Sequence, residues 1–205
     1  MQPKISAVGR KRNPFIEAAR RVQIIKAATE TVAEVGYAQA SLARIAQHAG
    51  ISKSVISYHF AGKDDLLEQV VTQIFDDGWA LIEPRLASAR TETERLHVHM
   101  EVELDYWGAN RTRYLAMASI VDGHRTSDGK PRFAQKWEET VTVLQDLLSK
   151  GQENGEFRDF DPRVVAVTVR QGIEGALDQW ARNPDLDLKA YTAELITLFD
   201  LAIRK

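Results

Sequence analysis

The sequence predicts an all-α protein, for three reasons. Apolar residues recur three or four positions apart along most of the chain, which is the spacing of one helix face. No segment alternates apolar and polar residues as a half-buried strand does. Turns containing Gly, Pro or Asn separate the periodic segments, and Ser, Thr, Asp or Asn often precedes the next one, where it would cap a helix.

Composition restricts the class of protein further. A chain of 205 residues is long enough for one or two domains whose core needs no disulfide or metal. Cysteine is absent, which excludes disulfide and thiolate chemistry and fits a reducing compartment. No apolar run reaches the roughly 18 residues of a membrane span, and the N-terminus has no apolar run of signal-peptide length. We therefore expect a cytoplasmic protein without a membrane partner.

Charge is distributed unevenly along the chain. Residues 1–63 contain ten basic and three acidic residues, giving +7, whereas residues 64–205 contain 17 basic and 26 acidic residues, giving −9. Without the four basic residues of segment 1–12, the N-terminal part still carries +3. This segregation is typical of a polyanion-binding unit joined to an acidic body. We accordingly divide the chain into an arm (1–12), a head (13–63) and a body (64–205).

The arm lacks hydrophobic periodicity and ends in Arg10, Lys11 and Arg12, so we expect it to be disordered. Such an arm either contacts nucleic acid or is simply solvated. The first helix is predicted to begin with Asn13 as cap and Pro14 in the first position. It should end near residue 36, which is a glycine.

Two short helices around a tight turn follow in segment 41–63. Ser41 caps the first, Gly50 ends it, and Ser52 opens the second. The apolar residues that anchor the pair are Leu42, Ile45, Ala46, Ala49, Val55, Ile56 and Phe60. This is the pattern of a helix-turn-helix, and the polar remainder of its second helix suits phosphates and base edges. Short helix pairs around a glycine are common in all-α proteins, so the pattern alone also fits a structural role.

The order of residues in this segment resembles the helix-turn-helix of the TetR family of bacterial transcriptional regulators. The family pattern runs from Gly-Tyr at the end of the first helix to a Lys-acid-acid-Leu start of the fourth. The matching residues are Gly36, Tyr37, Ser41, Leu42, Ile45, Ala46, Ala49, Gly50, Ile51, Ser52, Tyr58, His59, Phe60, Lys63, Asp64, Asp65 and Leu66. Ser54 and Ser57 stand where many members have Gly and Tyr, so no known operator sequence is carried over.

The resemblance implies a sequence-specific DNA-binding regulator, most often a ligand-responsive homodimeric repressor that binds a near-palindromic double-stranded operator. It implies a three-helix head for DNA and a helical bundle for an effector and for dimerisation. We expect Lys53, Ser54 and Ser57 to contact base edges. The residues expected to hold phosphates or to position the head are Arg10, Lys11, Arg12, Ser41, Ser52, Tyr58, His59 and Lys63.

The body is predicted to contain a long helix from residues 64–65, which Pro84 should kink or end. Its buried stripe is expected to comprise Leu67, Val70, Val71, Ile74, Leu81 and Ile82. In the family this helix links head and body. Further helices are expected over residues 91–107, 113–124, 131–151 and 162–182, and from residue 187, with Thr91, Asp161 and Asp187 at the start of three of them.

The last two helices carry apolar residues on more than one face, which indicates a partner surface. The resemblance implies that they form a four-helix bundle with a second copy of the chain. The residues expected in that dimer interface are Val169, Gly172, Ile173, Gly175, Ala176, Trp180, Leu195 and Leu198.

No catalytic or metal-binding constellation is recognisable. His97 and His99 are two positions apart, so on a helix they point in different directions and cannot share a metal. The motifs HExxH, GxGxxG and GxSxG and the P-loop are absent. We therefore expect neither an enzyme nor a protein with a cofactor or a metal.

The body instead has the composition of a small-molecule site, because aromatic and soft side chains cluster in its middle helices. The expected pocket residues are His97, Tyr106, Trp107, Tyr114, Met117, His124, Trp137, Gln171 and Asp178. At helical spacing such residues also fit a plain core. The alternative to a regulator is thus a helical small-molecule-binding protein without a DNA function.

Overall fold

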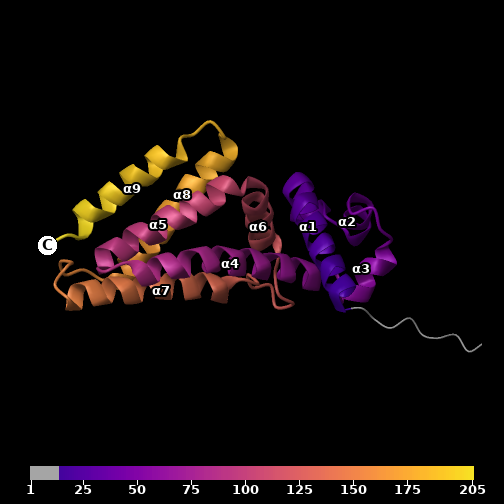
Figure 1. Cartoon of the computed structure of the whole chain (residues 1–205), viewed down its shortest axis with the longest axis horizontal. Coiled ribbons are helices and arrows are strands. Elements are labelled where there is room, and N and C mark those ends of the chain that lie inside the picture. The colour runs from indigo at the N-terminus through magenta and orange to yellow at the C-terminus, as the bar shows by residue number, and fades with distance from the viewer. Residues whose placement is uncertain (1–13) are drawn as a thin grey trace, which may run out of the picture.

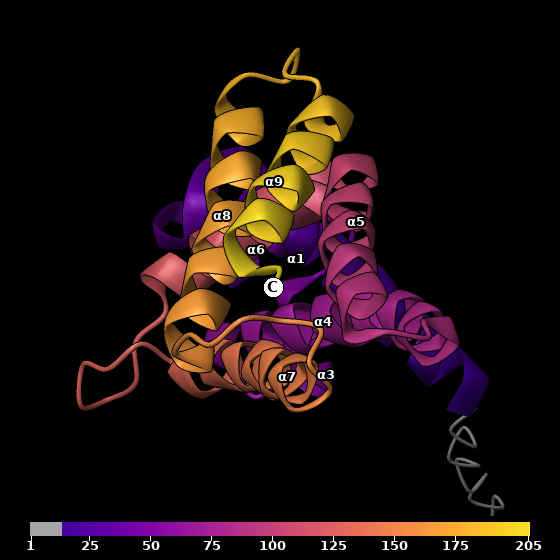
Figure 2. The ribbon, with the colours of Figure 1, turned by 90° about the vertical axis from the view of Figure 1, so that its left-hand side faces the viewer.

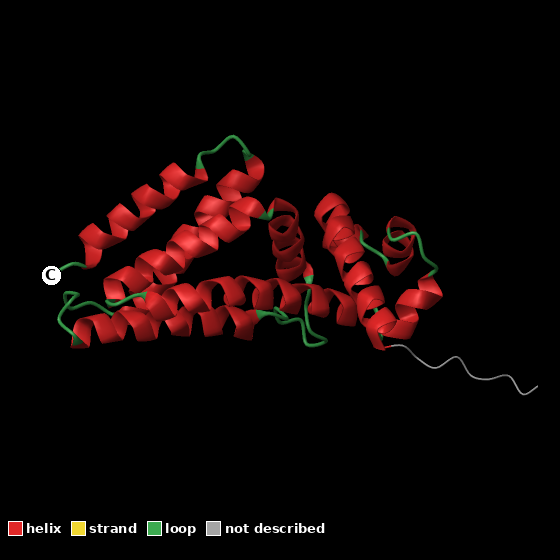
Figure 3. Cartoon of the chain, viewed as in Figure 1, coloured by secondary structure: helices red, strands yellow, loops and turns green. Residues whose placement is uncertain are grey.

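The computed structural model describes residues 14–205, which form helices joined by short loops (Figure 3). Within this range there is no strand, and two isolated β-bridges join Arg125 to Pro131 and Phe157 to Arg204. The predicted all-α class is confirmed. The arm and the Asn13 cap lie outside the described residues. The helices are α1 (Pro14–Gln39), α2 (Leu42–His48), α3 (Lys53–His59), α4 (Lys63–Ser88), α5 (Glu92–Ala109), α6 (Arg111–Gly123), α7 (Ala134–Glu153), α8 (Pro162–Arg182) and α9 (Leu188–Ile203).

The molecule is elongated, with α1, α2 and α3 gathered at one end as a head (Figure 1). Helix α4 leaves the head and runs along the body, where it packs on α5 and α6 and where α7 runs beside it. Helix α8 packs on α7 and α5, and α9 lies outermost. Helix α1 packs against both α6 and α4. Buried residues of head and body therefore belong to one continuous core, from Ile24 and Ile45 in the head to Leu144 in the body.

The end of α1 is fitted closely to α6. Gly36 has φ of 77°, a left-handed conformation that interrupts the helix at the predicted residue before a last turn to Gln39. The next residue, Tyr37, donates its backbone N–H to Ser119 Oγ at 2.8 Å. A Cβ on Gly123 would lie 2.5 Å from the Tyr37 ring, so glycine is needed there for the helices to approach. These contacts fix the head on the body.

Most predicted helix starts are confirmed by their caps. The side chains of Ser41, Thr91, Asp161 and Asp187 each accept a hydrogen bond from a backbone N–H of the following turn. Ser52 occupies the N-cap position of α3, but its hydroxyl pairs with a neighbouring side chain instead.

Helix α4 departs from the prediction in two respects. It does not end at Pro84 but continues to Ser88. A proline removes only one backbone donor, and here the buried Ile82 before it and the half-buried Leu86 after it hold this turn against the body. Leu81, expected in the buried stripe, is 53% exposed. The other five predicted stripe residues are buried.

Candidate DNA-binding surface and ligand cavity

Helix α3 is amphipathic and presents a polar face to solvent. Ile56 is fully buried, and Phe60, which follows the helix, is 3% exposed, so together they anchor the helix to the head. Lys53, Ser54 and Ser57, the expected base-contacting residues, are all exposed. The structure thus brings these three side chains together on the face of α3 that points away from the head core.

Other exposed polar residues surround this face. Ser41 Oγ accepts the Arg44 N–H at 3.2 Å, and Ser52 Oγ lies 2.8 Å from Ser54 Oγ. Tyr58 is 55% exposed. Arg44 is exposed on α2 and was not among the predicted DNA contacts. Its position in the sequence, as a basic residue between the anchoring residues Leu42 and Ile45, could have indicated such a contact. Arg10, Lys11 and Arg12 lie outside the described residues, and their role stays a prediction.

His59 and Lys63 are directed into the head and away from the exposed face of α3. The His59 side chain is 8% exposed, with Nδ1 3.6 Å from Glu17 Oε2. Lys63 Nζ donates to the carbonyl oxygen of Tyr37 at 2.6 Å and lies 4.1 Å from the centre of the Tyr37 ring. Burial lowers the pKa of Lys63. Both side chains therefore have partners inside the protein, and this geometry does not favour the phosphate contacts predicted for them.

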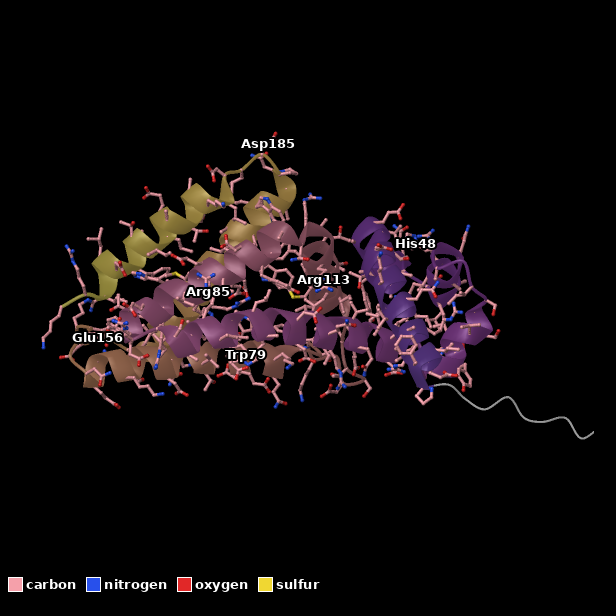
Figure 4. The ribbon with its side chains drawn as sticks, viewed as in Figure 1. His48, Trp79, Arg85, Arg113, Glu156 and Asp185 are labelled. Atoms are coloured by element: carbon pink, nitrogen blue, oxygen red, sulfur yellow. The ribbon has the colours of Figure 1, made fainter. Side chains whose placement is uncertain are left out.

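A cavity of about 310 Å³ opens in the body between α4, α5, α7 and α8. Its volume is at the lower end of the range for small-molecule sites. At its mouth, Trp79 and Val143 are 44% and 38% exposed, and Figure 4 shows Trp79 where α4 runs alongside α7. The lining residues are Ile74, Phe75, Asp76, Gly78, Trp79, Ile82, His99, Glu103, Tyr106, Trp107, Lys136, Glu139, Thr140, Val143 and Arg170.

Buried charged groups form one wall of the cavity. Arg170 on α8 bonds Glu103 on α5 through Nη1 and donates from Nε to Glu174 Oε1 at 3.0 Å. Burial opposes ionisation of Glu103, but the charge and the hydrogen bond of Arg170 hold the pKa of this carboxyl below its usual value. His99 Nε2 is 3.5 Å from Glu103 Oε2, yet neither ring nitrogen of His99 has a hydrogen-bond partner. Burial lowers the pKa of His99, so the ring is neutral at pH 7.

Tyr106 connects the cavity to the junction of head and body. Its ring lines the cavity, and its hydroxyl donates to the backbone carbonyl of Ile74 on α4 at 3.2 Å. The same hydroxyl accepts from Arg113 Nη1 on α6 at 3.1 Å, and this nitrogen also bonds Asp77 Oδ2 at 2.7 Å. Ile74 and Arg113 also line a second hollow of about 320 Å³ between α1, α4 and α6. Figure 4 shows Arg113 beside this junction.

Two of the nine predicted pocket residues, Tyr106 and Trp107, line the cavity. His97 lies outside it and pairs with Asp200 on α9 at 2.6 Å. His124 is buried at the head–body junction, where its ring stacks on Tyr37 at 5.7 Å.

The remaining predicted pocket residues also lie elsewhere. Tyr114 donates to Asp178 Oδ1 at 2.7 Å, Met117 packs against the core, and Trp137 Nε1 and Gln171 Nε2 bond Glu174. The lining residues that were not predicted include the aromatic Phe75 and Trp79 and the polar or charged His99, Glu103 and Arg170. A signal existed for three of them, because His99 with Glu103 and Arg170 with Glu174 are charged or polar pairs four residues apart, the spacing of neighbours on one helix face.

The predicted dimer residues on α8 and α9 face mainly inward. Val169, Ile173 and Ala176 are fully buried within the chain, and Trp180 and Leu195 are 7% and 9% exposed. A Cβ on Gly172 would lie 3.1 Å from Leu195 of the same chain, whereas a Cβ on Gly175 would meet nothing within 4 Å.

The outer surface of these two helices nevertheless carries large apolar side chains. Helices α8 and α9 lie side by side (Figure 2). Leu198, which was predicted, is 61% exposed, and Val164 on α8 and Leu201 on α9 are 61% and 59% exposed.

Among the described residues, no group of three or more His, Asp or Glu side chains is placed to hold a metal ion. No helix in the described range is long and apolar enough to cross a membrane.

Comparisons with known proteins agree with the geometry of the head and the body. Residues 24–70 match the family model described as bacterial regulatory proteins, tetR family. The HTH-type transcriptional regulator BetI 1 of Chromohalobacter salexigens is 38% identical over 169 residues, which cover 80% of this chain and 78% of that protein.

Two solved structures share the fold. The fatty acid degradation regulator FadR of Bacillus halodurans superposes with a TM-score of 0.80 at 21% identity, covering 93% of this chain and 97% of that one. FadR of Bacillus subtilis, solved with stearoyl-CoA, gives 0.75 at 22% identity, covering 86% and 96%. On the family match, the relative and the exposed recognition helix, this chain is a DNA-binding transcriptional regulator that belongs to the TetR family.

Proposed function

We propose that the protein is a homodimeric repressor that binds a near-palindromic operator and releases it when a small molecule enters the body cavity. The observation that carries the proposal is the exposed polar face of α3, anchored from behind by Ile56 and Phe60. We assign DNA binding to residues 13–63 with the arm 1–12, and effector binding and dimerisation to residues 64–205.

Lys53, Ser54 and Ser57 are the proposed base-contacting residues. Tyr58 and the exposed Arg44 of α2 supply phosphate contacts beside them, together with the basic arm. Such contacts orient a helix in the major groove, while hydrogen bonds to base edges read the sequence.

Dimerisation through α8 and α9 supplies the second head. The apolar side chains of Val164, Leu198 and Leu201 give a second copy of the chain a surface to cover. A two-fold axis there places two copies of α3 on one side of the dimer. Two half-sites one DNA turn apart, about 34 Å, then bind both heads at once.

The route from the cavity to the head runs through α4 and Tyr106. Helix α4 contributes the cavity wall around Ile74 and extends without a break to Lys63, beside α3. A ligand that pushes on the Tyr106 ring acts directly on Arg113 and Asp77 through the phenol hydroxyl. The ligand shifts the equilibrium between two head separations only if it binds them with different affinities. FadR of Bacillus subtilis was solved in complex with stearoyl-CoA, which supports ligand binding by a regulator of this fold.

Fluorescence anisotropy with the DNA upstream of the protein's own coding region tests DNA recognition. Labelled upstream DNA and a scrambled duplex are titrated at two salt concentrations. We expect tight, salt-sensitive binding to the upstream DNA and a preference of at least a thousandfold over the scramble, or about 4 kcal/mol.

Two variants assign that preference to α3. Ser57→Ala should change the preference at one base position by on the order of 1 kcal/mol. Lys130→Ala, which removes an exposed lysine from a loop of the body, is the control and should leave it unchanged. If neither the upstream DNA nor any fragment selected from genomic DNA is preferred, the regulator proposal fails. The helical small-molecule-binding protein without DNA function then takes its place.

A further inference from the structure

His99 is a polar group without a hydrogen-bond partner in the wall of the cavity, although its Nε2 lies 3.5 Å from Glu103 Oε2. It is 4% exposed, and neither Nδ1 nor Nε2 makes a hydrogen bond. Leaving buried polar atoms unpaired is unfavourable, because they lose their bonds to water without replacing them. A residue that lines a cavity and has lost its water contacts therefore favours a ligand that supplies the missing bonds.

The charge around His99 restricts what that ligand can be. Burial lowers the pKa of His99, so the neutral ring offers one N–H donor and one bare nitrogen acceptor. The cavity wall has three carboxylates, Asp76, Glu103 and Glu139, against the two cations Lys136 and Arg170. The guanidinium of Arg170 is already bonded to Glu103 and to a second carboxylate. An anionic ligand would thus meet a net negative wall without an available buried cation.

The rest of the wall is apolar and aromatic. The rings of Phe75, Trp79, Tyr106 and Trp107 line it, and Val143 borders the mouth. Aromatic and aliphatic walls bind flat or bulky apolar bodies without requiring a hydrogen bond from them.

We propose that the cavity binds an uncharged compound with an aromatic or alicyclic body and one hydroxyl group, and that His99 hydrogen-bonds this hydroxyl. A hydroxyl is both a donor and an acceptor, so it can satisfy either nitrogen of the neutral ring. This inference rests on the proposed function for the cavity as the effector site, and it adds the chemical class of the effector and the residue that selects it.

Calorimetric titration of the full chain, without DNA, tests the proposal with four matched probes. These are para-phenylphenol, biphenyl, para-phenylbenzoate and the para-trimethylammonium derivative of biphenyl. The wild type should bind the phenol about tenfold tighter than biphenyl, the gain expected from one net hydrogen bond. It should bind the carboxylate and the ammonium compound more weakly than the phenol.

Variants of two histidines on α5 assign that preference. His99→Phe keeps a ring of similar size and removes both nitrogens, so the ratio of phenol to biphenyl affinity should fall to about one. His99→Gln keeps a donor and an acceptor and should retain part of the preference. His97→Phe is the matched control, because His97 pairs with Asp200 outside the cavity, and its ratio should stay at the wild-type value.

Three results would overturn the inference: equal binding of phenol and biphenyl to the wild type, tighter binding of the ammonium or the carboxylate, or no binding of any probe. A ratio of phenol to biphenyl affinity that stays at the wild-type value in His99→Phe would also overturn it.

Operator binding, measured separately by anisotropy, distinguishes this inference from the effector proposal. A phenol that binds through His99 without weakening operator binding supports the inference and contradicts the effector role of the cavity. If a compound of another class releases the operator while phenol and biphenyl bind equally, the effector role is supported and this inference is contradicted.

Discussion

Replacing Arg170 by methionine should destabilise the body strongly. The guanidinium is 8% exposed and bonds Glu103, whose side chain is 10% exposed, and Glu174. Arg170→Met keeps the aliphatic bulk but leaves the Glu103 carboxylate buried without its cation. Breaking a buried ion pair from one side is unfavourable by about 3–5 kcal/mol, a large share of the 5–15 kcal/mol that stabilises a typical domain.

Urea unfolding followed by circular dichroism and by tryptophan fluorescence measures the effect, provided that the two transitions coincide. The control is Arg163→Met on the same helix, because the Arg163–Glu138 pair is about half-exposed on both sides and should contribute less than about 1 kcal/mol. The double variant Arg170→Met with Glu103→Leu removes both buried charges and should recover most of the loss. If Arg170→Met costs no more than Arg163→Met, the buried pair does not stabilise the body as reasoned.

The pH dependence provides an independent check on the same residue. In the wild type the pKa of Glu103 lies below its ordinary value, so the pairing stabilises the fold above the ordinary carboxyl pKa. This contribution is lost as the pH falls through the lowered pKa. In Arg170→Met, burial is no longer opposed by the guanidinium, and the folded variant takes up a proton at Glu103. Its deficit relative to the wild type should therefore shrink between about pH 8 and about pH 5. A deficit that grows toward acid would contradict this assignment.

Three further predictions concern the head, the subunit surface and a helix start. Arg44→Ala, which removes a proposed phosphate contact, should weaken binding to all DNA sequences alike and flatten the salt dependence by about one unit. Lys63→Met should leave that slope unchanged and lower the thermal midpoint. Gly172→Leu should lower the thermal midpoint of each protomer, because its side chain would meet Leu195 of the same chain. Gly175→Leu should weaken only the dimer, as measured by sedimentation equilibrium. A Gly172→Leu variant that is monomeric but fully stable would contradict the packing described. Asp161→Ala should cost about 1 kcal/mol in urea unfolding, because two N–H groups of α8 lose their acceptor.

The sequence predicted those features that depend on neighbouring residues. Thr91, Asp161 and Asp187 cap helices because a short polar side chain bonds the N–H two or three positions ahead, and this is visible in the chain order. The interruption at Gly36 and the polar face of α3 are local in the same sense. Pro84 was misjudged because the packing of the residues around it, which is a tertiary effect, outweighs one lost backbone bond.

Features that depend on contacts between distant helices were not predicted. Lys63 matches the family pattern, but its direction is set by the Tyr37 carbonyl, 26 residues away. Aromatic composition predicted a ligand site in the body without showing which rings face the cavity, so Tyr114 was expected there although it bonds Asp178. Because α8 has apolar residues on several faces, its sequence likewise did not show that Ile173 is buried within the chain and Val164 is exposed.

Ile74 lies in the walls of two hollows, and this position restricts how the ligand specificity of such a regulator can change during evolution. Ile74 borders both the body cavity and the hollow beneath α1, and Tyr106 is bonded to its carbonyl. Under the proposed function, substitutions on this side of the cavity alter effector preference and operator affinity together, so few of them are expected to be neutral for both. Thr140 and Val143, on the α7 side, line the body cavity but not the hollow beneath α1. New effector specificities should thus accumulate first along α7, while the α4 side stays fixed by the requirement to keep repressing.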